Sequence, residues 1–227
     1  MFTGLVETTG AVQLVEASGP GARIALNVPL ADLGWPRFEL GASVAVNGVC
    51  LTVTRERADG FDADVSAETL ALTTLGGLSS GAQVNIERSL KLGAPMGGHI
   101  VLGHVDGVAE VRVVEAVGEA WRVVIRPPKE LARFIAAKGS VCLDGVSLTV
   151  NRLAAAGGGE DDDFELMLVP HTLEVTILSA WGPGTKVNLE VDVLARYVLR
   201  GAEVARREDP GARDARLMDK LKRGGLV

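Results

Sequence analysis

The sequence predicts an all-β fold of two similar antiparallel barrels in tandem, followed by one α-helix. Three observations carry this prediction: the chain repeats itself at an offset of about one hundred residues, each copy consists of short alternating apolar runs, and only the last segment has helical periodicity. A chain of 227 residues can bury a core in each copy. We therefore expect an N-terminal barrel over 1–95, a C-terminal barrel over 96–190, and a helix with a tail over 191–227.

The repeat is visible in four matched pairs of segments. GASVAVNGVCLTV at 41–53 matches KGSVCLDGVSLTV at 138–150, an offset of 97, and GLVE at 4–7 matches GHVD at 103–106, an offset of 99. Segments 68–70 and 84–87 match 171–173 and 187–190 at an offset of 103. The second copy carries AAAGGGEDDD at 154–163, whose glycines and acidic residues predict an inserted solvated turn. This pattern indicates a gene duplication, with the copies joined near 92–98.

The first copy has mostly strand signals. Asn47 and Gly48 separate two alternating runs, and this dipeptide favours a hairpin because both turn residues need positive φ. A short helical turn is expected near Leu30–Leu33. Strands are expected at 12–15, 23–28, 43–46, 49–53 and 84–88.

The second copy repeats this pattern with one stronger helix signal. Strands are expected at 111–114 and 121–125, and Asp144 and Gly145 provide the hairpin turn. Pro128 suits a first helical turn, and Gly139 suits the end of that helix. The apolar residues that would share one face of this helix are Leu131, Phe134 and Ile135.

The tail differs in kind. From 191 to about 207, Leu194, Tyr197, Val198 and Val204 recur at helical spacing among charged residues. A lone amphipathic helix must cover this stripe, so we expect it to dock on a barrel or on another copy of the chain. Beyond Pro210 the mixed charges indicate a mobile end.

Composition excludes several classes of protein. The net charge of −6 argues against phosphate-backbone binding, and no apolar run approaches the roughly 20 residues of a membrane helix. The N-terminus lacks the features of a signal peptide. Cys50 and Cys142 form neither a disulfide framework nor a paired metal-ligand spacing, and no dinucleotide, NTP, hydrolase or dithiol motif occurs. We expect a soluble cytoplasmic protein without a metal, a nucleic-acid partner or a membrane partner.

The two hairpins present matched polar groups. Successive strand residues point to opposite faces, so the apolar residues of each hairpin face the core. Cys50 and Thr52 then lie on the outer face of the first copy, and Ser147 and Thr149 on that of the second. Such residues could be ordinary surface positions, but their recurrence in both copies favours a functional face.

Two histidines flank the segment after Gly97 and Gly98. His99 and His104 have no carboxylate or cysteine at ligand spacing, which argues against a metal. Either could transfer a proton near neutral pH, although the sequence alone favours structural histidines hydrogen-bonded in a loop. Lys138 and Asp144 could similarly form only a surface ion pair.

Several long motifs resemble the riboflavin synthase alpha-chain family. They are MFTG at 1–4, NGVCLTV at 47–53, GGHIVLGHVD at 97–106 and DGVSLTV at 144–150, and the resemblance spans about residues 1–200. It implies two six-stranded Greek-key barrels, a C-terminal helix that forms a homotrimer, and no cofactor. It also implies the last step of riboflavin formation, in which two molecules of 6,7-dimethyl-8-ribityllumazine dismutate to riboflavin and 5-amino-6-ribitylaminouracil.

The resemblance implies related ligand sites in both barrels. In the family, an active site forms between the N-terminal barrel of one subunit and the C-terminal barrel of another. The implied catalytic candidates are Cys50, Ser147, His104 and Lys138. The implied substrate contacts in the first copy are Phe2, Thr3, Gly4, Leu5, Val6, Cys50, Leu51, Thr52, Asp64, Val65, Ser66, Ala67, Glu68 and Thr69. Those in the second copy are Gly103, His104, Val105, Lys138, Ser147, Leu148, Thr149, Met167, Leu168, Val169, Pro170, His171 and Thr172.

The implied chemistry requires orientation and modest acid–base help. The C7-methyl group of the lumazine is acidic because its carbanion delocalises into the ring, so no strong nucleophile is needed. A dismutation of identical molecules needs unequal sites, and Cys50 stands where the second copy has Ser147. We expect Cys50 to assist addition chemistry at the N-terminal site and Ser147 mainly to orient the second lumazine.

The chain departs from the family at few positions. Leu102 stands where a polar residue is common, and Ala67 stands where proline is frequent. The competing hypothesis is a lumazine protein, a relative that binds lumazine or flavin without catalysis and keeps a good site mainly in the N-terminal barrel. The complete second hairpin, with Lys138, favours the enzyme. An association with lumazine synthase is a further possibility that the sequence leaves open.

Overall fold

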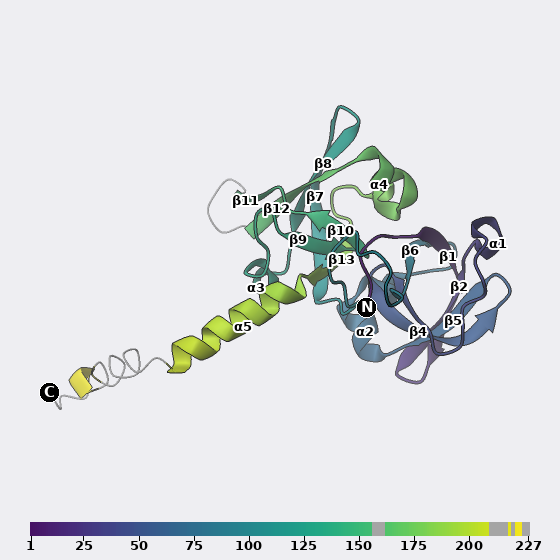
Figure 1. Ribbon diagram of the computed structural model, residues 1–227, viewed down its shortest axis with the longest axis horizontal. Helices are drawn as coiled ribbons and strands as arrows, with labels where there is room; N and C mark the ends of the chain where they lie inside the picture. Colours follow the sequence, from purple (N-terminus) through teal and green to yellow (C-terminus); the bar gives the residue numbers. More distant parts are fainter. Residues whose placement is uncertain (156–161, 209–217, 219–220, 224–227) are drawn as a thin grey trace. The chain divides into compact units, whose positions relative to one another are not determined.

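The computed structural model describes residues 1–155, 162–208, 218 and 221–223. Residues 1–192 form one compact unit, and residues from 193 onward form a second. The all-β prediction with a C-terminal helix is confirmed (Figure 1). Within the described residues, no helix is both long enough and apolar enough to span a membrane.

The first repeat is a closed antiparallel barrel with the strand order β1-β2-β5-β4-β3-β6 (Figure 1). The Asn47-Gly48 turn joins β3 to β4, and both turn residues have positive φ as predicted. The core comprises buried aliphatic residues and the rings of Phe38 and Phe61, which meet at an interplanar angle of 58°. The strands are β1 Thr8–Ser18, β2 Gly21–Asn27, β3 Ser43–Val46, β4 Val49–Arg57, β5 Gly60–Val65 and β6 Gln83–Arg88. The helical segments are α1 Leu30–Leu33, α2 Ala67–Leu72 and the 3-10 turn η1 Thr74–Gly77.

The second repeat follows the same path as a curled sheet of seven strands in the order β10-β9-β13-β7-β8-β12-β11. Its strands are β7 Gly107–Val117, β8 Ala120–Arg126, β9 Ser140–Leu143, β10 Val146–Thr149, β11 Arg152–Ala155, β12 Asp162–Leu168 and β13 Lys186–Val191. Its helical segments are α3 Lys129–Ala132, α4 Pro170–Val175 and the 3-10 turn η2 Ile177–Ala180.

The difference between the sheets lies at one point. In the first repeat β4 is continuous and carries a bulge against β5 between Val53 and Arg55. In the second repeat the matching strand leaves the ladder after Thr149 and resumes at Arg152. The strand that corresponds to β4 is therefore split into β10 and β11, which form opposite edges of the sheet. This split gives the second repeat seven strands instead of the expected six.

Two local predictions for the second repeat are wrong. The helix from Pro128 ends at Ala132 and does not reach Gly139. The N–H groups of Phe134, Ile135 and Gly139 each bond the carbonyl three residues earlier, which makes separate turns instead of a continuous α-helix. In addition, Lys138 has a φ of 65°, outside the helical region. The expected solvated turn at 154–163 is partly strand. Its first two residues belong to β11 and its last two to β12, in which Asp163 is buried and binds Arg126 at 2.9 Å. Its central residues, 156–161, lie outside the described part of the chain.

The second unit contains the predicted tail helix, α5 Val193–Glu208. Its apolar residues Leu194, Tyr197 and Val198 are exposed in the single chain. The prediction of a mobile end beyond Pro210 falls mostly on residues outside the described ranges.

Candidate active site

The functional face of each hairpin is covered by a strap from the other repeat. The N-terminal strap, residues 1–6, reaches the second repeat, where the Ser147 N–H donates to the Gly4 carbonyl at 2.7 Å. A second strap, residues 100–105, reaches the first repeat, where the Cys50 N–H donates to the Gly103 carbonyl at 2.9 Å. The straps pair with each other through Phe2 and Val101. The repeats therefore exchange covering segments with approximate twofold symmetry.

Glycine is required where each strap crosses its hairpin. A Cβ at Gly4 would lie 2.6 Å from the Ser147 Cβ, and one at Gly103 would lie 2.5 Å from the Cys50 Cβ. Both glycines have positive φ, 75° and 78°, which disfavours other residues. The predicted contacts near Gly4 therefore lie beside Ser147 within this chain, and those near Gly103 beside Cys50.

A buried carboxylate holds each strap in place. Glu87 on β6 accepts hydrogen bonds from the Thr3 N–H at 2.6 Å, the Thr3 hydroxyl at 2.8 Å and the Gly4 N–H at 3.1 Å. Glu190 on β13 accepts from the N–H groups of Leu102 at 2.7 Å and Gly103 at 2.9 Å. Burial raises the pKa of both carboxyl groups, although these donors oppose the rise.

Ser147 has a histidine partner that the sequence analysis did not include in the site. The Ser147 Oγ lies 2.7 Å from the His99 Nδ1. The opposite ring nitrogen, Nε2, is buried and has no hydrogen-bond partner among the described residues. Burial lowers the pKa of His99, with Asp192 acting in the opposite sense, and this shift favours the neutral ring. The clue in the sequence was the position of His99 directly after Gly98. In the structure a Cβ at Gly98 would lie 2.0 Å from the Thr3 carbonyl oxygen, so glycine is needed beside the N-terminal strap.

Cys50 has apolar surroundings instead. Its half-buried side chain packs against the cluster of Phe2, Ala45, Val101 and Cys142 between the repeats. Burial raises the pKa of the Cys142 thiol well above its usual value, so Cys142 is a neutral core residue. Of the two cysteines, only Cys50 reaches the outer face that hairpin parity predicted.

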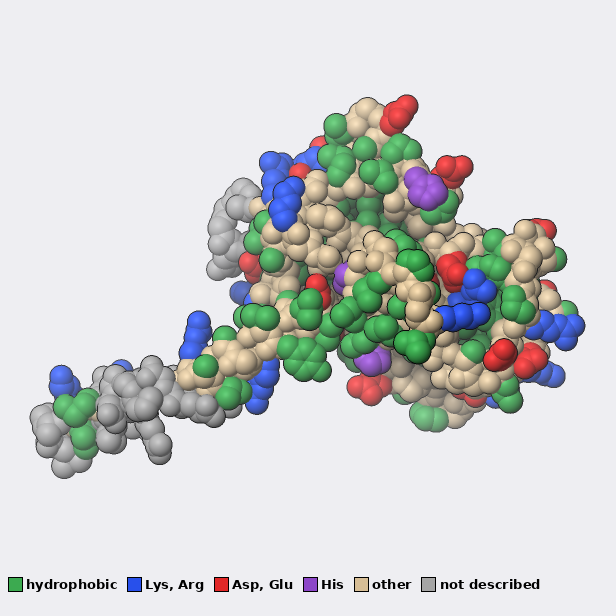
Figure 2. Space-filling model, in the orientation of Figure 1, with side chains coloured by type: hydrophobic (Ala, Val, Ile, Leu, Met, Phe, Trp, Pro, Cys, Tyr) green, Lys and Arg blue, Asp and Glu red, His purple; other side chains and the backbone are tan. Residues whose placement is uncertain are grey.

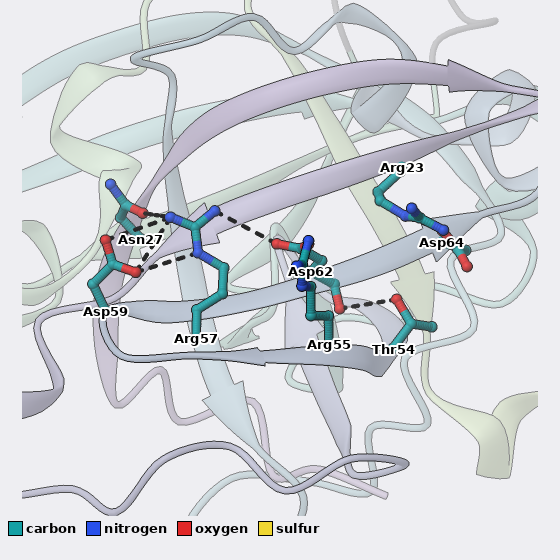
Figure 3. A network of polar contacts seen from close by, with 8 residues as sticks. All are labelled: Arg23, Asn27, Thr54, Arg55, Arg57, Asp59, Asp62 and Asp64. Carbon is teal, nitrogen blue, oxygen red and sulfur yellow. Dashed lines mark hydrogen bonds and ion pairs between the residues drawn. The ribbon is translucent and has the colours of Figure 1, made fainter.

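The rest of the first predicted site lies along the outer face of β4, β5 and α2. Thr52 and Asp64 are both exposed. Val53 pairs with Ala63 in the antiparallel ladder of β4 and β5, so the next residues along the two strands, Thr52 and Asp64, lie side by side. Asp64 binds Arg23 at 2.9 Å, beside the network in which Arg57 contacts Asp59, Asp62 and Asn27 (Figure 3). Ser66 caps α2 by accepting a hydrogen bond from the Thr69 N–H at 3.1 Å.

The second predicted site follows β10, the end of β12 and α4. Met167 occupies the place of Asp64 and faces Arg122 across the ladder. The α4 helix begins without a side-chain cap and has Pro170 in its first turn, whereas α2 has Ser66 as cap and Ala67 in its first turn. The two faces therefore share a backbone design and differ in polarity.

Predicted site residues differ in how they can meet a ligand. The exposed ones are Leu5, Thr52, Asp64, Ser66, Ala67, Glu68, His104, Lys138, Thr149, Met167, Val169, Pro170 and His171. The half-buried ones are Val6, Cys50, Thr69, Val105, Ser147, Leu148 and Thr172. The buried ones are Phe2, Thr3, Gly4, Leu51, Val65, Gly103 and Leu168. Phe2 and the strand residues of the buried set pack inward, so their side chains serve the fold.

The three histidines are not gathered at one point. They lie apart from one another in Figure 2, and no group of three or more potential ligands occurs within the described residues. His104 and Lys138 are exposed and have no hydrogen bond to Cys50 or Ser147 among the described contacts.

A pocket of about 350 Å³ opens beside the N-terminal strap, a volume within the range of small-molecule sites. Its walls include Thr3, Leu5, Glu87, Arg88 and Lys91. Arg88 is fixed by Glu7 at 2.7 Å and lies 3.6 Å from the centre of the Trp35 ring. Figure 2 shows hydrophobic side chains gathered around the N-terminus.

Comparison with known proteins agrees with this geometry. The lumazine binding domain model matches residues 3–89 and 102–192, which are the two repeats. The riboflavin synthase of Mycobacterium tuberculosis is 48% identical over 88% of this chain and 97% of its own length, and that of Brucella abortus is 44% identical over 89% and 98%. The riboflavin synthase of Photobacterium phosphoreum is 39% identical over the full length of both chains.

Solved structures show the same architecture. The crystal structure of LumP complexed with riboflavin superposes with a TM-score of 0.74 at 26% identity, covering 84% of this chain and 99% of that chain. The complex of LumP with 6,7-dimethyl-8-(1'-D-ribityl) lumazine gives 0.72 at 25% identity over the same shares. The fold and the paired hairpins thus define a protein with two lumazine-binding domains.

Within that class the similarity is specific. Identities of 39–48% to riboflavin synthases over nearly the whole chain exceed those to LumP. The chain belongs to the riboflavin synthase family, which confirms the resemblance seen in the sequence.

Proposed function

We propose that the chain forms riboflavin by dismutation of two molecules of 6,7-dimethyl-8-ribityllumazine, with 5-amino-6-ribitylaminouracil as the second product. Membership of the riboflavin synthase family makes the chain an enzyme of riboflavin formation. The observation that carries the two-substrate reaction is the presence, in both repeats, of a polar hairpin face under a glycine strap. Two related faces suit two copies of one substrate.

The Ser147 side supplies acid–base help in this proposal. A neutral His99 at 2.7 Å from the Ser147 Oγ can accept the serine proton, so that the oxygen can take a proton from the C7-methyl group of a bound lumazine. The electron pair left on that carbon delocalises into the lumazine ring. The Cys50 thiol can then assist addition at the other face, as the sequence suggested. Lys138 and His104, both exposed, are proposed as ligand contacts.

Purified protein incubated with the lumazine and no added cofactor tests the function. We expect one riboflavin for every two lumazines consumed. Riboflavin is measured by its absorbance and fluorescence. Release of riboflavin below this ratio, with lumazine lost to other products, would contradict dismutation.

A second candidate function is lumazine or flavin binding without catalysis. The LumP complexes support it, because that fold holds both ligands. The higher identity to riboflavin synthases and the intact Ser147–His99 pair favour the enzyme. Tight binding of lumazine with no turnover would establish this alternative.

We also propose that the chain is a homotrimer held by α5. Support comes from the exposed apolar side chains of Leu194, Tyr197 and Val198. Because Val191 is buried in the second core, the chain should be truncated after Asp192 rather than within β13. Sedimentation should then show monomers with much reduced activity, whereas an active trimer would reject this role. A cytoplasmic location and an association with lumazine synthase remain predictions.

A further inference from the structure

We propose that Glu87 and Glu190 are positioning residues that act across the boundary between the repeats: Glu87 sets Ser147 and His99, and Glu190 sets Cys50. The inference rests on the proposed function of these hairpins, but its consequences can be measured without turnover. Neither carboxylate contacts the side chain that it positions. Each acts through a strap.

The path from Glu87 to Ser147 has two steps. Glu87 binds the N–H groups of Thr3 and Gly4 and the Thr3 hydroxyl, at 2.6 to 3.1 Å. The carbonyls of the same two residues then accept the N–H of His99 at 3.1 Å and that of Ser147 at 2.7 Å. One carboxylate on the first repeat therefore fixes the backbone on both sides of the Ser147–His99 hydrogen bond.

The path from Glu190 to Cys50 has the same form. Glu190, on the second repeat, binds the N–H groups of Leu102 and Gly103. The Gly103 carbonyl accepts the Cys50 N–H at 2.9 Å, and the Cα of Cys50 would lie 3.0 Å from a Cβ at Gly103. A shift of this strap would move the Cys50 backbone directly.

A carboxylate suits this task better than an amide. Glu87 and Glu190 are 5% and 4% exposed, so their oxygens are held by protein donors. Each uses both oxygens as acceptors, one for each of two consecutive N–H groups. A glutamine would present an N–H₂ group to one of these donors and lose that hydrogen bond. The strap would then be released at one of its two anchors.

The two clamps differ in their third donor. It is the Thr3 hydroxyl for Glu87 and the backbone N–H of His104 for Glu190. A Thr3→Val variant can therefore weaken the Glu87 clamp without changing its carboxylate, whereas the described contacts of Glu190 offer no such side-chain donor.

The test compares Glu87→Gln with Glu190→Gln in the full chain. For Glu87→Gln we expect the pKa of His99, measured by NMR, to rise toward that of an exposed histidine, with a smaller change in the rate of Cys50 modification by a thiol reagent. For Glu190→Gln we expect the rate of Cys50 modification to rise several-fold, with a smaller change in the pKa of His99. The smaller changes are expected because the two straps pair through Phe2 and Val101. Riboflavin formation should fall in both variants, by about 10- to 100-fold, since small misplacements of reacting groups have large costs.

Three results would overturn the proposal. They are equal effects of the two variants on both readouts, a larger effect on the hairpin of the repeat that carries the substituted glutamate than on the hairpin of the other repeat, and no change in either readout. If Glu87→Gln does not fold, Glu87→Asp and Thr3→Val weaken the same clamp more gently and should move the His99 pKa in the same direction. Absence of riboflavin formation by the unmodified chain would refute the proposed function and leave these readouts informative.

Discussion

The two repeats build the same hairpin and place different chemistry on it. Both have a positive-φ turn, an outward residue at the second position of the returning strand, and a glycine strap from the other repeat. Yet Ser147 bonds a histidine ring, whereas Cys50 packs against apolar side chains. Duplication has preserved backbone hydrogen bonds, and single side-chain changes have given the two faces different surroundings. Unequal faces suit a reaction in which one substrate molecule donates and the other accepts.

The largest expected effect comes from removing the two outward groups. Ser147→Ala should slow single-turnover riboflavin formation by about 100-fold, because it removes the group coupled to His99. Cys50→Ala should slow it by about tenfold, since the thiol assists addition without a paired base. Lumazine affinity should fall more for Ser147→Ala. Equal small losses in both variants, with unchanged affinity, would mean that these faces are ordinary surface.

A second difference lies in the hairpin turns and should affect stability. Asn47 accepts the Asn85 N–H in the first repeat, and Asp144 accepts the Asn188 N–H in the second, at 2.7 and 2.8 Å. Asp144 also accepts the Trp181 indole N–H. Burial raises the pKa of Asp144 to about 7. The folded chain thus holds a proton that the unfolded chain releases near pH 4.

The sign of the pH effect follows from this proton. As pH rises from about 4 to about 7, the unfolded state loses the proton first, so the free energy of unfolding falls, by about 2–4 kcal/mol at most. Asp144→Asn should remove this pH dependence, although the Trp181 N–H then loses its acceptor. Chemical denaturation at pH 5 and pH 8 measures the difference in the free energy of unfolding between the two pH values.

The matched variant Asn47→Asp should create a new loss of stability at high pH in the first repeat. Parallel pH profiles for wild type and Asp144→Asn would show that Asp144 is not the group responsible.

The smallest expected effect concerns the exposed faces. Arg23 and Asp64 form an ion pair in which both side chains are 49% exposed, and such pairs contribute less than about 1 kcal/mol. Asp64→Asn should therefore leave thermal stability nearly unchanged, and any large fall in lumazine affinity would report a ligand contact. Met167→Asn, at the matching place in the second repeat, tests whether the second face contacts a ligand in the same way. A drop of several degrees in Tm for Asp64→Asn would instead assign this residue to the fold.

Structural features that depend on local sequence patterns could be predicted from the sequence. Features that depend on contacts between distant segments could not. Matched segments identified the duplication, strand alternation placed Cys50 and Ser147 outward, and helical spacing located α5. The pairing of His99 with Ser147 depends on the path of a strap over another repeat, which no periodicity records. The short α3 and the split between β10 and β11 also depend on tertiary context, since apolar spacing alone fits a longer helix and a continuous strand.

The exchanged straps also order the events of biosynthesis. Residues 1–6 are made before two of their partners, because Val101 follows Phe2 by 99 residues and Ser147 follows Gly4 by 143 residues. The first barrel can close its own ladder while its hairpin is still uncovered. The N-terminal strap can already bind Glu87 of that barrel, but its contacts with Val101 and Ser147 must wait for the second repeat. Docking of both straps is then a late, long-range step, which contact-order arguments place among the slower events of folding. A nascent chain stalled before Val101 should carry a formed first barrel whose N-terminal strap is held by the first repeat alone.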